Sequence, residues 1–184
     1  FSFLNNFIGD KVLNLINFDD SNRSTAIGKN ALSGNTGSRN TALGYEAITT
    51  NNTGISNAAF GYQALKANSS GSENLAFGDS ALVANTTGSD NSAIGYNSLA
   101  VNVSGSNNSA VGARSLSSNT GSRNSALGVN SLAGNTSGGT NTALGFNAGY
   151  TNTGQYSNKT GSNNVYLGYN AGSWSDGTTT NFNN

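Results

Sequence analysis

The chain has 184 residues with no cysteine, histidine, proline or methionine, and its 8 basic and 8 acidic residues cancel. These absences exclude disulfides, thiolate or imidazole metal sites and catalysis by Cys or His, so we expect no enzyme and no cofactor. Balanced, sparse charge argues against a nucleic-acid partner, and no apolar run reaches the roughly 18 residues of a membrane-spanning helix.

Residues 1–21 differ in kind from the rest of the chain. Leu4, Ile8, Val12 and Leu15 fall at helical spacing among several phenylalanines. An exposed end of a repeat array must be covered or joined to something. We therefore predict a short helical segment that caps the repeats and links them to an upstream domain, with contacts among copies of the chain.

Residues 22–173 form a repeat that argues against disorder and against an ordinary globular core. An apolar residue followed by glycine recurs every 16 or 17 residues, with one interval of 23. Such a period indicates a solenoid. The repeat glycines are Gly28, Gly44, Gly61, Gly78, Gly95, Gly112, Gly128, Gly145 and Gly168.

Each unit is too short for two helices, and its side chains alternate as in a strand. Thr41, Leu43 and Tyr45 share one face, and Ala42 and Gly44 share the other. A second short extended piece follows around the Asn-Ala-Leu sequence. We predict an all-β parallel β-solenoid, or β-roll, of about nine coils with two short strands in each.

We expect the strand face that carries Ala42 and Gly44 to make the contacts between rolls, because small side chains let another sheet approach closely. The residues expected to pack there are Ala42, Gly44, Ala59, Gly61, Ala76, Gly78, Ala93, Gly95, Ala110, Gly112, Ala126, Gly128, Ala143 and Gly145. The aromatic residues that follow several of the glycines are expected to pack at a coil corner or between subunits, with a sugar-binding stripe as the alternative.

Two rows of asparagine run through the units, four residues before and seven residues after the repeat glycine. In-register amide side chains can form hydrogen bonds along a stack, so we predict a structural role for both rows. The first row is Asn40, Asn57, Asn74, Asn91, Asn108, Asn124, Asn141 and Asn164. The second row is Asn35, Asn51, Asn68, Asn85, Asn102, Asn119, Asn135 and Asn152.

Eight Asn-X-Ser/Thr sequences have two interpretations. They are acceptors for a ladder of glycans in a secreted eukaryotic or viral product, or chance matches in a chain rich in Asn and Ser, which we favour. Their asparagines are Asn22, Asn51, Asn68, Asn85, Asn102, Asn107, Asn135 and Asn158.

The interval of 23 residues places an insertion before the last coil. Irregular loops on a rigid scaffold are where binding residues concentrate, so we expect receptor contacts from Gln155, Tyr156, Asn158 and Lys159. Residues 174–184 begin with Trp174, which is expected to plug the last coil, and continue as a polar tail.

The sequences at 40–45, 91–99 and 141–148 resemble the head repeats of trimeric autotransporter adhesins, the YadA-like proteins. They are also similar to repeats of trimeric phage tail fibres and bacterial adhesive fibres. The resemblance covers about residues 22–173, and it implies left-handed rolls that form a homotrimer on the outside of a cell or virion and serve attachment to a surface receptor or glycan.

Three functions remain open. We favour a non-enzymatic adhesive fibre segment, and a passive spacer or filament subunit without its own receptor site is the runner-up. An ice-binding solenoid is disfavoured, because the row of hydroxyls that it needs is interrupted by Ala58, Leu75 and Val165.

Overall fold

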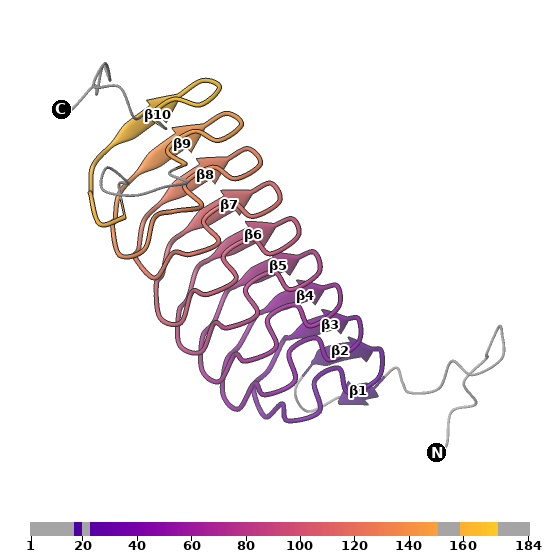
Figure 1. The fold of residues 1–184 in the computed structure, drawn as a ribbon. Helices are drawn as coiled ribbons and strands as arrows, with labels where there is room; N and C mark the ends of the chain where they lie inside the picture. Colours follow the sequence, from indigo (N-terminus) through magenta and orange to yellow (C-terminus); the bar gives the residue numbers. More distant parts are fainter. Residues whose placement is uncertain (1–16, 20–22, 151–158, 173–184) are drawn as a thin grey trace, which may run out of the picture.

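The computed structural model describes residues 17–19, 23–150 and 159–172. They form an elongated β-solenoid in which β1 and β10 lie at opposite ends (Figure 1). The strands are β1 Asn17–Asp19, β2 Ser24–Ile27, β3 Thr41–Leu43, β4 Ala58–Phe60, β5 Leu75–Phe77, β6 Ser92–Ile94, β7 Ser109–Val111, β8 Ser125–Leu127, β9 Thr142–Leu144 and β10 Val165–Leu167.

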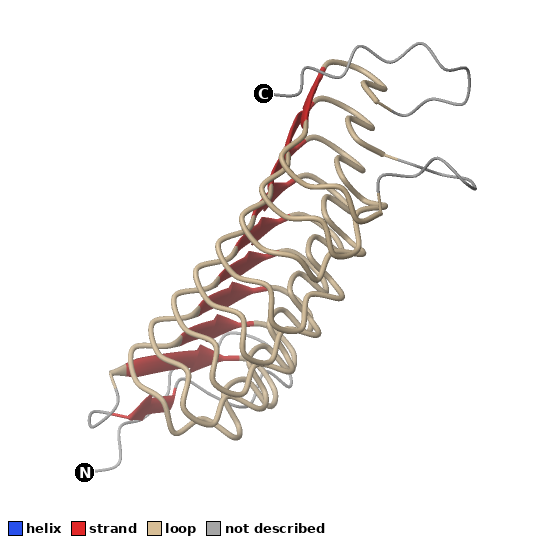
Figure 2. Ribbon diagram, turned by 90° about the vertical axis from the view of Figure 1, so that its left-hand side faces the viewer, coloured by secondary structure: helices blue, strands red, loops and turns tan. Residues whose placement is uncertain are grey.

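Strands β2 to β10 form one parallel ladder in which each strand pairs with the strand one coil away. All nine strands stack on the same side of the coils (Figure 2). Equivalent repeat positions pair throughout, as Ala110 does with Ala126 across a spacing of 16 residues and Leu144 with Leu167 across the spacing of 23. The solenoid and its register confirm the sequence prediction, including the placement of length changes in turns.

Strand β1 pairs antiparallel with β2 and so covers the first edge of the ladder. Residues 17–19 are therefore strand, which corrects the helix expected to extend through them. The remainder of that expectation, in residues 1–16 and 20–21, lies outside the described residues, as does the predicted plug at Trp174. Among the residues that the structure describes there is no helix.

The expected second strand of each coil is absent from the described residues, and a turn takes its place. In the coil that follows Gly44, Glu46 has φ 54° and Ile48 has φ 48°. These left-handed conformations bend the chain and cannot belong to an extended strand. The coils remain bonded to one another there, as by the Ile48 amide, which donates to the Ala64 carbonyl oxygen at 3.0 Å.

One alanine in each of the strands β2 to β9, the residue before the outward apolar residue, lines the interior of the coil. The exposure of these alanines is 3% or less in the single chain, and they pack with a row of buried leucines and isoleucine from the turn. The expectation that alanines pack between rolls was therefore wrong, because no surface remains for a second chain to touch. The corrected positions are Ala42, Ala59, Ala76, Ala93, Ala110, Ala126 and Ala143.

The repeat glycines allow the coils to stack closely, and their expected contact between rolls stays a prediction. Gly95 has φ +132°, and a Cβ built on it would lie 2.6 Å from the carbonyl carbon of Gly112 in the next coil. Glycine is required there because the adjacent backbone fills the space of a side chain. The same close approach to the next coil holds for Gly44, Gly61, Gly78, Gly112, Gly128 and Gly145.

The last described coil closes the core with a different residue. Tyr166 stands where the other strands have alanine, and it is 7% exposed. Gly149 stands where earlier coils have a buried leucine, and a Cβ there would lie 2.8 Å from the Tyr166 ring. The loss of leucine at this position thus makes room for a larger side chain from the neighbouring strand.

Both asparagine rows form ladders as predicted, although the second row is interrupted between Asn102 and Asn119 and its last member, Asn152, lies outside the described residues. The Asn91 side chain donates to the Asn74 side-chain oxygen at 3.1 Å and to the Gly105 carbonyl at 2.9 Å. Its own Oδ1 accepts from the backbone N–H of Asn108 at 3.0 Å. Burial of these amides is tolerated because their polar atoms find partners in adjacent coils.

Candidate functional site

The outward face of the parallel sheet is the candidate functional surface. Strand side chains alternate, so the burial of Ala42 turns Thr41 and Leu43 outward. The apolar residues before the repeat glycines form what we call the outer apolar row. Its members are Ile27, Leu43, Phe60, Phe77, Ile94, Val111, Leu127, Leu144 and Leu167.

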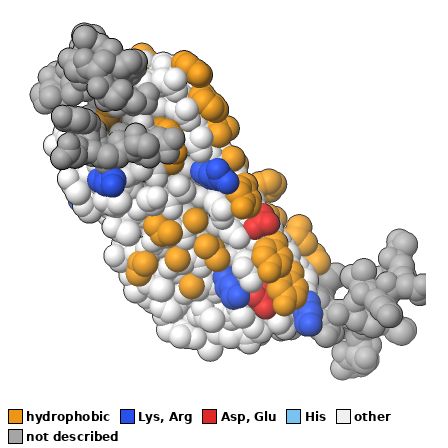
Figure 3. Space-filling model, viewed as in Figure 1, with side chains coloured by type: hydrophobic (Ala, Val, Ile, Leu, Met, Phe, Trp, Pro, Cys, Tyr) orange, Lys and Arg blue, Asp and Glu red, His pale blue; other side chains and the backbone are white. Residues whose placement is uncertain are grey.

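Most of this row is open to solvent in the single chain. Phe77 is 56% exposed and Leu127 is 50% exposed, while Phe60 and Val111 are half-buried. Hydrophobic side chains form a line along one long edge of the body (Figure 3). Isolated exposed apolar residues are ordinary, but a continuous row over nine strands is typical of an interaction surface.

Aromatic rings beside the outer apolar row stack from coil to coil. The Tyr45 and Tyr62 rings lie 5.4 Å apart between centroids and 8° from parallel. The Phe146 and Tyr169 rings lie 5.6 Å apart and 10° from parallel. These rings thus pack at the coil corner while keeping exposed surface, which fits one of the two packing roles expected from the sequence.

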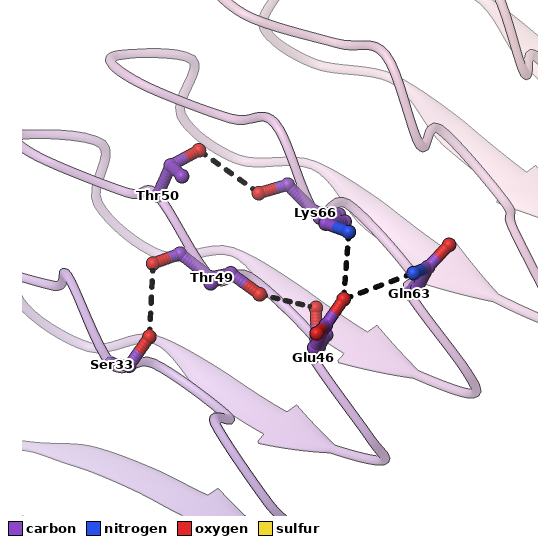
Figure 4. Close-up of polar contacts among 6 residues, drawn as sticks. All are labelled: Ser33, Glu46, Thr49, Thr50, Gln63 and Lys66. Carbon is purple, nitrogen blue, oxygen red and sulfur yellow. Dashed lines mark hydrogen bonds and ion pairs between the residues drawn. The ribbon is translucent and has the colours of Figure 1, made fainter.

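A charged cluster joins two coils beside the first ring pair. Glu46 accepts hydrogen bonds on Oε2 from Lys66 Nζ at 2.7 Å and from Gln63 Nε2 at 2.9 Å (Figure 4). Together with the Tyr45 hydroxyl these donors lower the pKa of Glu46 from 4.5 to about 2. The carboxylate in turn raises the pKa of Tyr45 and of Lys66 above their ordinary values. The cluster ties adjacent coils together, and hydroxyls of Ser33, Thr49 and Thr50 add bonds to backbone carbonyls nearby (Figure 4).

Of the four expected receptor-contact residues, the structure describes only Lys159. Gln155, Tyr156 and Asn158 lie outside the described residues. The Lys159 backbone is held against the preceding coil, because its carbonyl oxygen accepts from the Thr136 amide at 2.7 Å and from the Thr136 hydroxyl at 2.6 Å. Its side chain borders a hollow of about 450 Å³ that Arg114 and Tyr150 also line.

The structure bears on the glycosylation alternative. Five of the eight sequon asparagines are fully buried within the ladder and are bonded through their amide nitrogen, which is the atom that a glycan would modify. A glycan at these positions is incompatible with the folded coil. They are Asn51, Asn68, Asn85, Asn102 and Asn135.

A serine ladder was missed by the sequence reasoning. The Ser72 amide donates to Ser89 Oγ at 3.0 Å, and the Ser89 amide donates to Ser106 Oγ at 3.0 Å. These serines follow the turn glycine in successive units. The fixed position was a usable signal, but it was obscured by the abundance of serine elsewhere in the chain.

Within the described ranges, no three Asp, Glu, His or Cys side chains gather as a metal site would require. No helix of the same residues is long and apolar enough to cross a bilayer. Comparisons of the chain with protein-family models, with curated proteins and with solved structures return no match.

Proposed function

We propose that the chain is a non-enzymatic segment of an extracellular fibre, assembled as a homotrimer, that attaches to a cell or host surface. One observation carries the proposal: most of the outer apolar row is exposed along the parallel ladder of an elongated body. The resemblance to autotransporter adhesin heads supports the same function, with left-handed coils and residues 1–21 as a cap.

A second and third copy of this chain are the occupants that we propose for the outward face. Each copy carries the same apolar row at the same spacing, since every coil adds one strand at roughly 4.8 Å. Identical spacing lets side chains of one copy pack between those of another over the full length. Charge does not oppose the contact, because the net charge is zero and the outer apolar row itself holds no charged residue.

Light scattering on the whole chain tests the assembly directly. We expect three times the chain mass of 18.6 kDa. Ile94→Asp, at an outward position of β6, should dissociate the trimer because it places a carboxylate in the apolar contact. Val101→Asp is the matched control, since Val101 is exposed to a similar extent but lies in a turn. A monomeric wild-type chain at micromolar concentration would contradict the trimer.

Attachment is tested with beads coated with the chain and applied to bacterial and epithelial cells. We expect the wild-type chain and Val101→Asp to hold beads to at least one of these surfaces. A trimer that holds beads to none of the cells tested would support the passive spacer instead.

A further inference from the structure

The hollow beside Lys159 crosses three successive coils. Its rim includes Arg114 and Ser117 from one coil, Asn130 and Thr136 from the next, and Tyr150 and Lys159 from the coil that carries the insertion. Its volume of about 450 Å³ falls within the roughly 300–1,000 Å³ of small-molecule sites. The hollow is therefore large enough for a saccharide.

The Arg114 side chain and the Lys159 backbone are held by defined contacts. Arg114 lies at a left-handed corner with φ 59°, and its guanidinium carbon is 5.9 Å from the centroid of the Tyr96 ring. Lys159 starts from a backbone whose carbonyl oxygen is bonded to the amides of both Thr136 and Ser137. Arg114 is therefore partly ordered before a ligand binds and Lys159 starts from a fixed backbone, which lowers the entropy cost of ordering the two side chains.

Seven of the eight acidic residues lie among the first 90 residues, and the eighth, Asp176, lies outside the described residues. The first 90 residues hold 7 acidic and 5 basic side chains, whereas residues 91–175 hold Arg114, Arg123 and Lys159 and no acidic residue. Among the described residues, no carboxylate lines the hollow. The ion pair between Lys66 and Glu46 lies elsewhere, in the first 90 residues of the chain. Among the described residues, Arg114 and Lys159 thus line the hollow without a carboxylate beside them.

We propose that this hollow binds an acidic saccharide through its carboxylate. A guanidinium matches a carboxylate with two parallel hydrogen bonds, and an ammonium adds a second positive charge. The hydroxyls of Ser117 and Thr136 donate to the carbonyls of Ala133 and Lys159, so their oxygens can still accept from sugar hydroxyls. The Asn130 amide donates one hydrogen to Asn147 and offers its second N–H to the sugar. Tyr150 offers a flat apolar ring against which a sugar ring can pack. The inference rests on the proposed attachment function and names the class of receptor.

Calorimetric titration with trigalacturonate tests the site, and its methyl-esterified form is the control ligand because only the carboxylate charge is removed. Wild-type chain should bind the acid and not the ester. Arg114→Gln and Lys159→Gln should each weaken binding about tenfold or more, since each removes a charge-assisted hydrogen bond. Arg123→Gln removes an equal charge from an exposed turn outside the hollow and should leave binding unchanged. Thermal melts of the three variants should match the wild-type melt.

Four results would overturn the inference: no binding of trigalacturonate, equal binding of acid and ester, equal loss in Arg123→Gln, or tighter binding of a sulfated trisaccharide. The outcome is separable from that of the proposed function. A trimer that holds beads to cells but binds no acidic saccharide would contradict only this inference. A monomer that attaches to no cell would contradict the proposed function, whatever the titration shows.

Discussion

The interior asparagines of the first row bond to the coils on both sides of them. Asn91 is fully buried, its amide nitrogen donates to Asn74 and Gly105, and its oxygen accepts from Asn108. Asn164 lies in the last described coil, where its amide bonds to Asn141 and Ser162 and it is only partly buried. Asparagines of this row should therefore contribute differently to the free energy of unfolding, depending on their place in the stack.

We predict that Asn91→Ala lowers the free energy of unfolding by about 1–3 kcal/mol, because it strands buried partners in two coils. Asn164→Ala should cost less, since fewer partners are lost and water reaches them. Urea unfolding of both variants measures the difference. Equal losses would contradict a ladder whose interior members count for more.

The repeat glycines allow a second comparison. A methyl group at Gly95 would collide with the backbone of Gly112, whereas at Gly168 no described atom lies within 4 Å of the added carbon. Both positions have positive φ, +132° and +114°, so both substitutions share the backbone strain.

Gly95→Ala should therefore destabilise the chain far more than Gly168→Ala, which carries only the conformational cost of about 1–3 kcal/mol. Circular dichroism melts of the two variants are the measurement. A similar drop in melting temperature would show that backbone strain, and not the close stacking of coils, explains the glycine row.

A shortened turn interrupts the second asparagine row. Asn85, Asn102 and their neighbours bond in sequence along the stack, but Oδ1 of Asn102 has no partner among the described atoms. The next coil is one residue shorter in its turn, and Asn119 donates to Gly121 without reaching Asn102. Chain length in a turn thus decides whether a buried bond forms.

Inserting one threonine between Thr120 and Gly121 should restore the longer turn and let Asn119 reach Asn102. We expect a gain of about 1 kcal/mol, because a buried acceptor becomes satisfied. The control inserts threonine after Thr86, where the turn already has full length, and should destabilise the chain. An unchanged or lower melting temperature for the first insertion would argue against this explanation.

The cluster at Glu46 predicts a pH dependence. Its pKa falls from 4.5 to about 2 on folding, so the folded chain binds this proton less readily than the unfolded chain. The stabilisation is complete above pH 4.5 and is lost as the pH falls toward 2. Melting temperature measured from pH 6 to pH 2 should therefore decline less steeply in Glu46→Gln than in the wild type. An equally steep decline in Glu46→Gln would contradict this role for the cluster.

The molecule as a whole behaves as a linear array, since each coil contacts only its neighbours through the ladder order β2 to β10. Stability in such arrays is approximately a sum over repeats and their interfaces. Deleting residues 79–95 removes one complete coil and joins Gly78 to Tyr96 in register.

We expect that deletion to leave a folded solenoid, shorter by roughly 4.8 Å and only modestly less stable. Deleting residues 79–86 removes half a coil and should unfold the stack, because strands could no longer pair in register. Small-angle scattering measures the length and circular dichroism the folding. A full-coil deletion that unfolds the chain would contradict the array.

The repeat period alone determined the class of fold, the number of strands in the ladder, their register and the asparagine ladders, because equivalent residues in a stack must meet their own counterparts. Tertiary structure decided which strand face points inward. The alternation of side chains along a strand is the same whichever face points inward. The coil is narrow, so its interior holds the methyl group of Ala93 beside Leu99, and the larger side chain of Ile94 points outward. Left-handed corners such as those of Glu46 and Ile48, in residue types that rarely adopt them, concealed the turn that replaces the second strand. The hollow also needed the structure, since Arg114 and Lys159 come together only because the coils stack across an interval of irregular length.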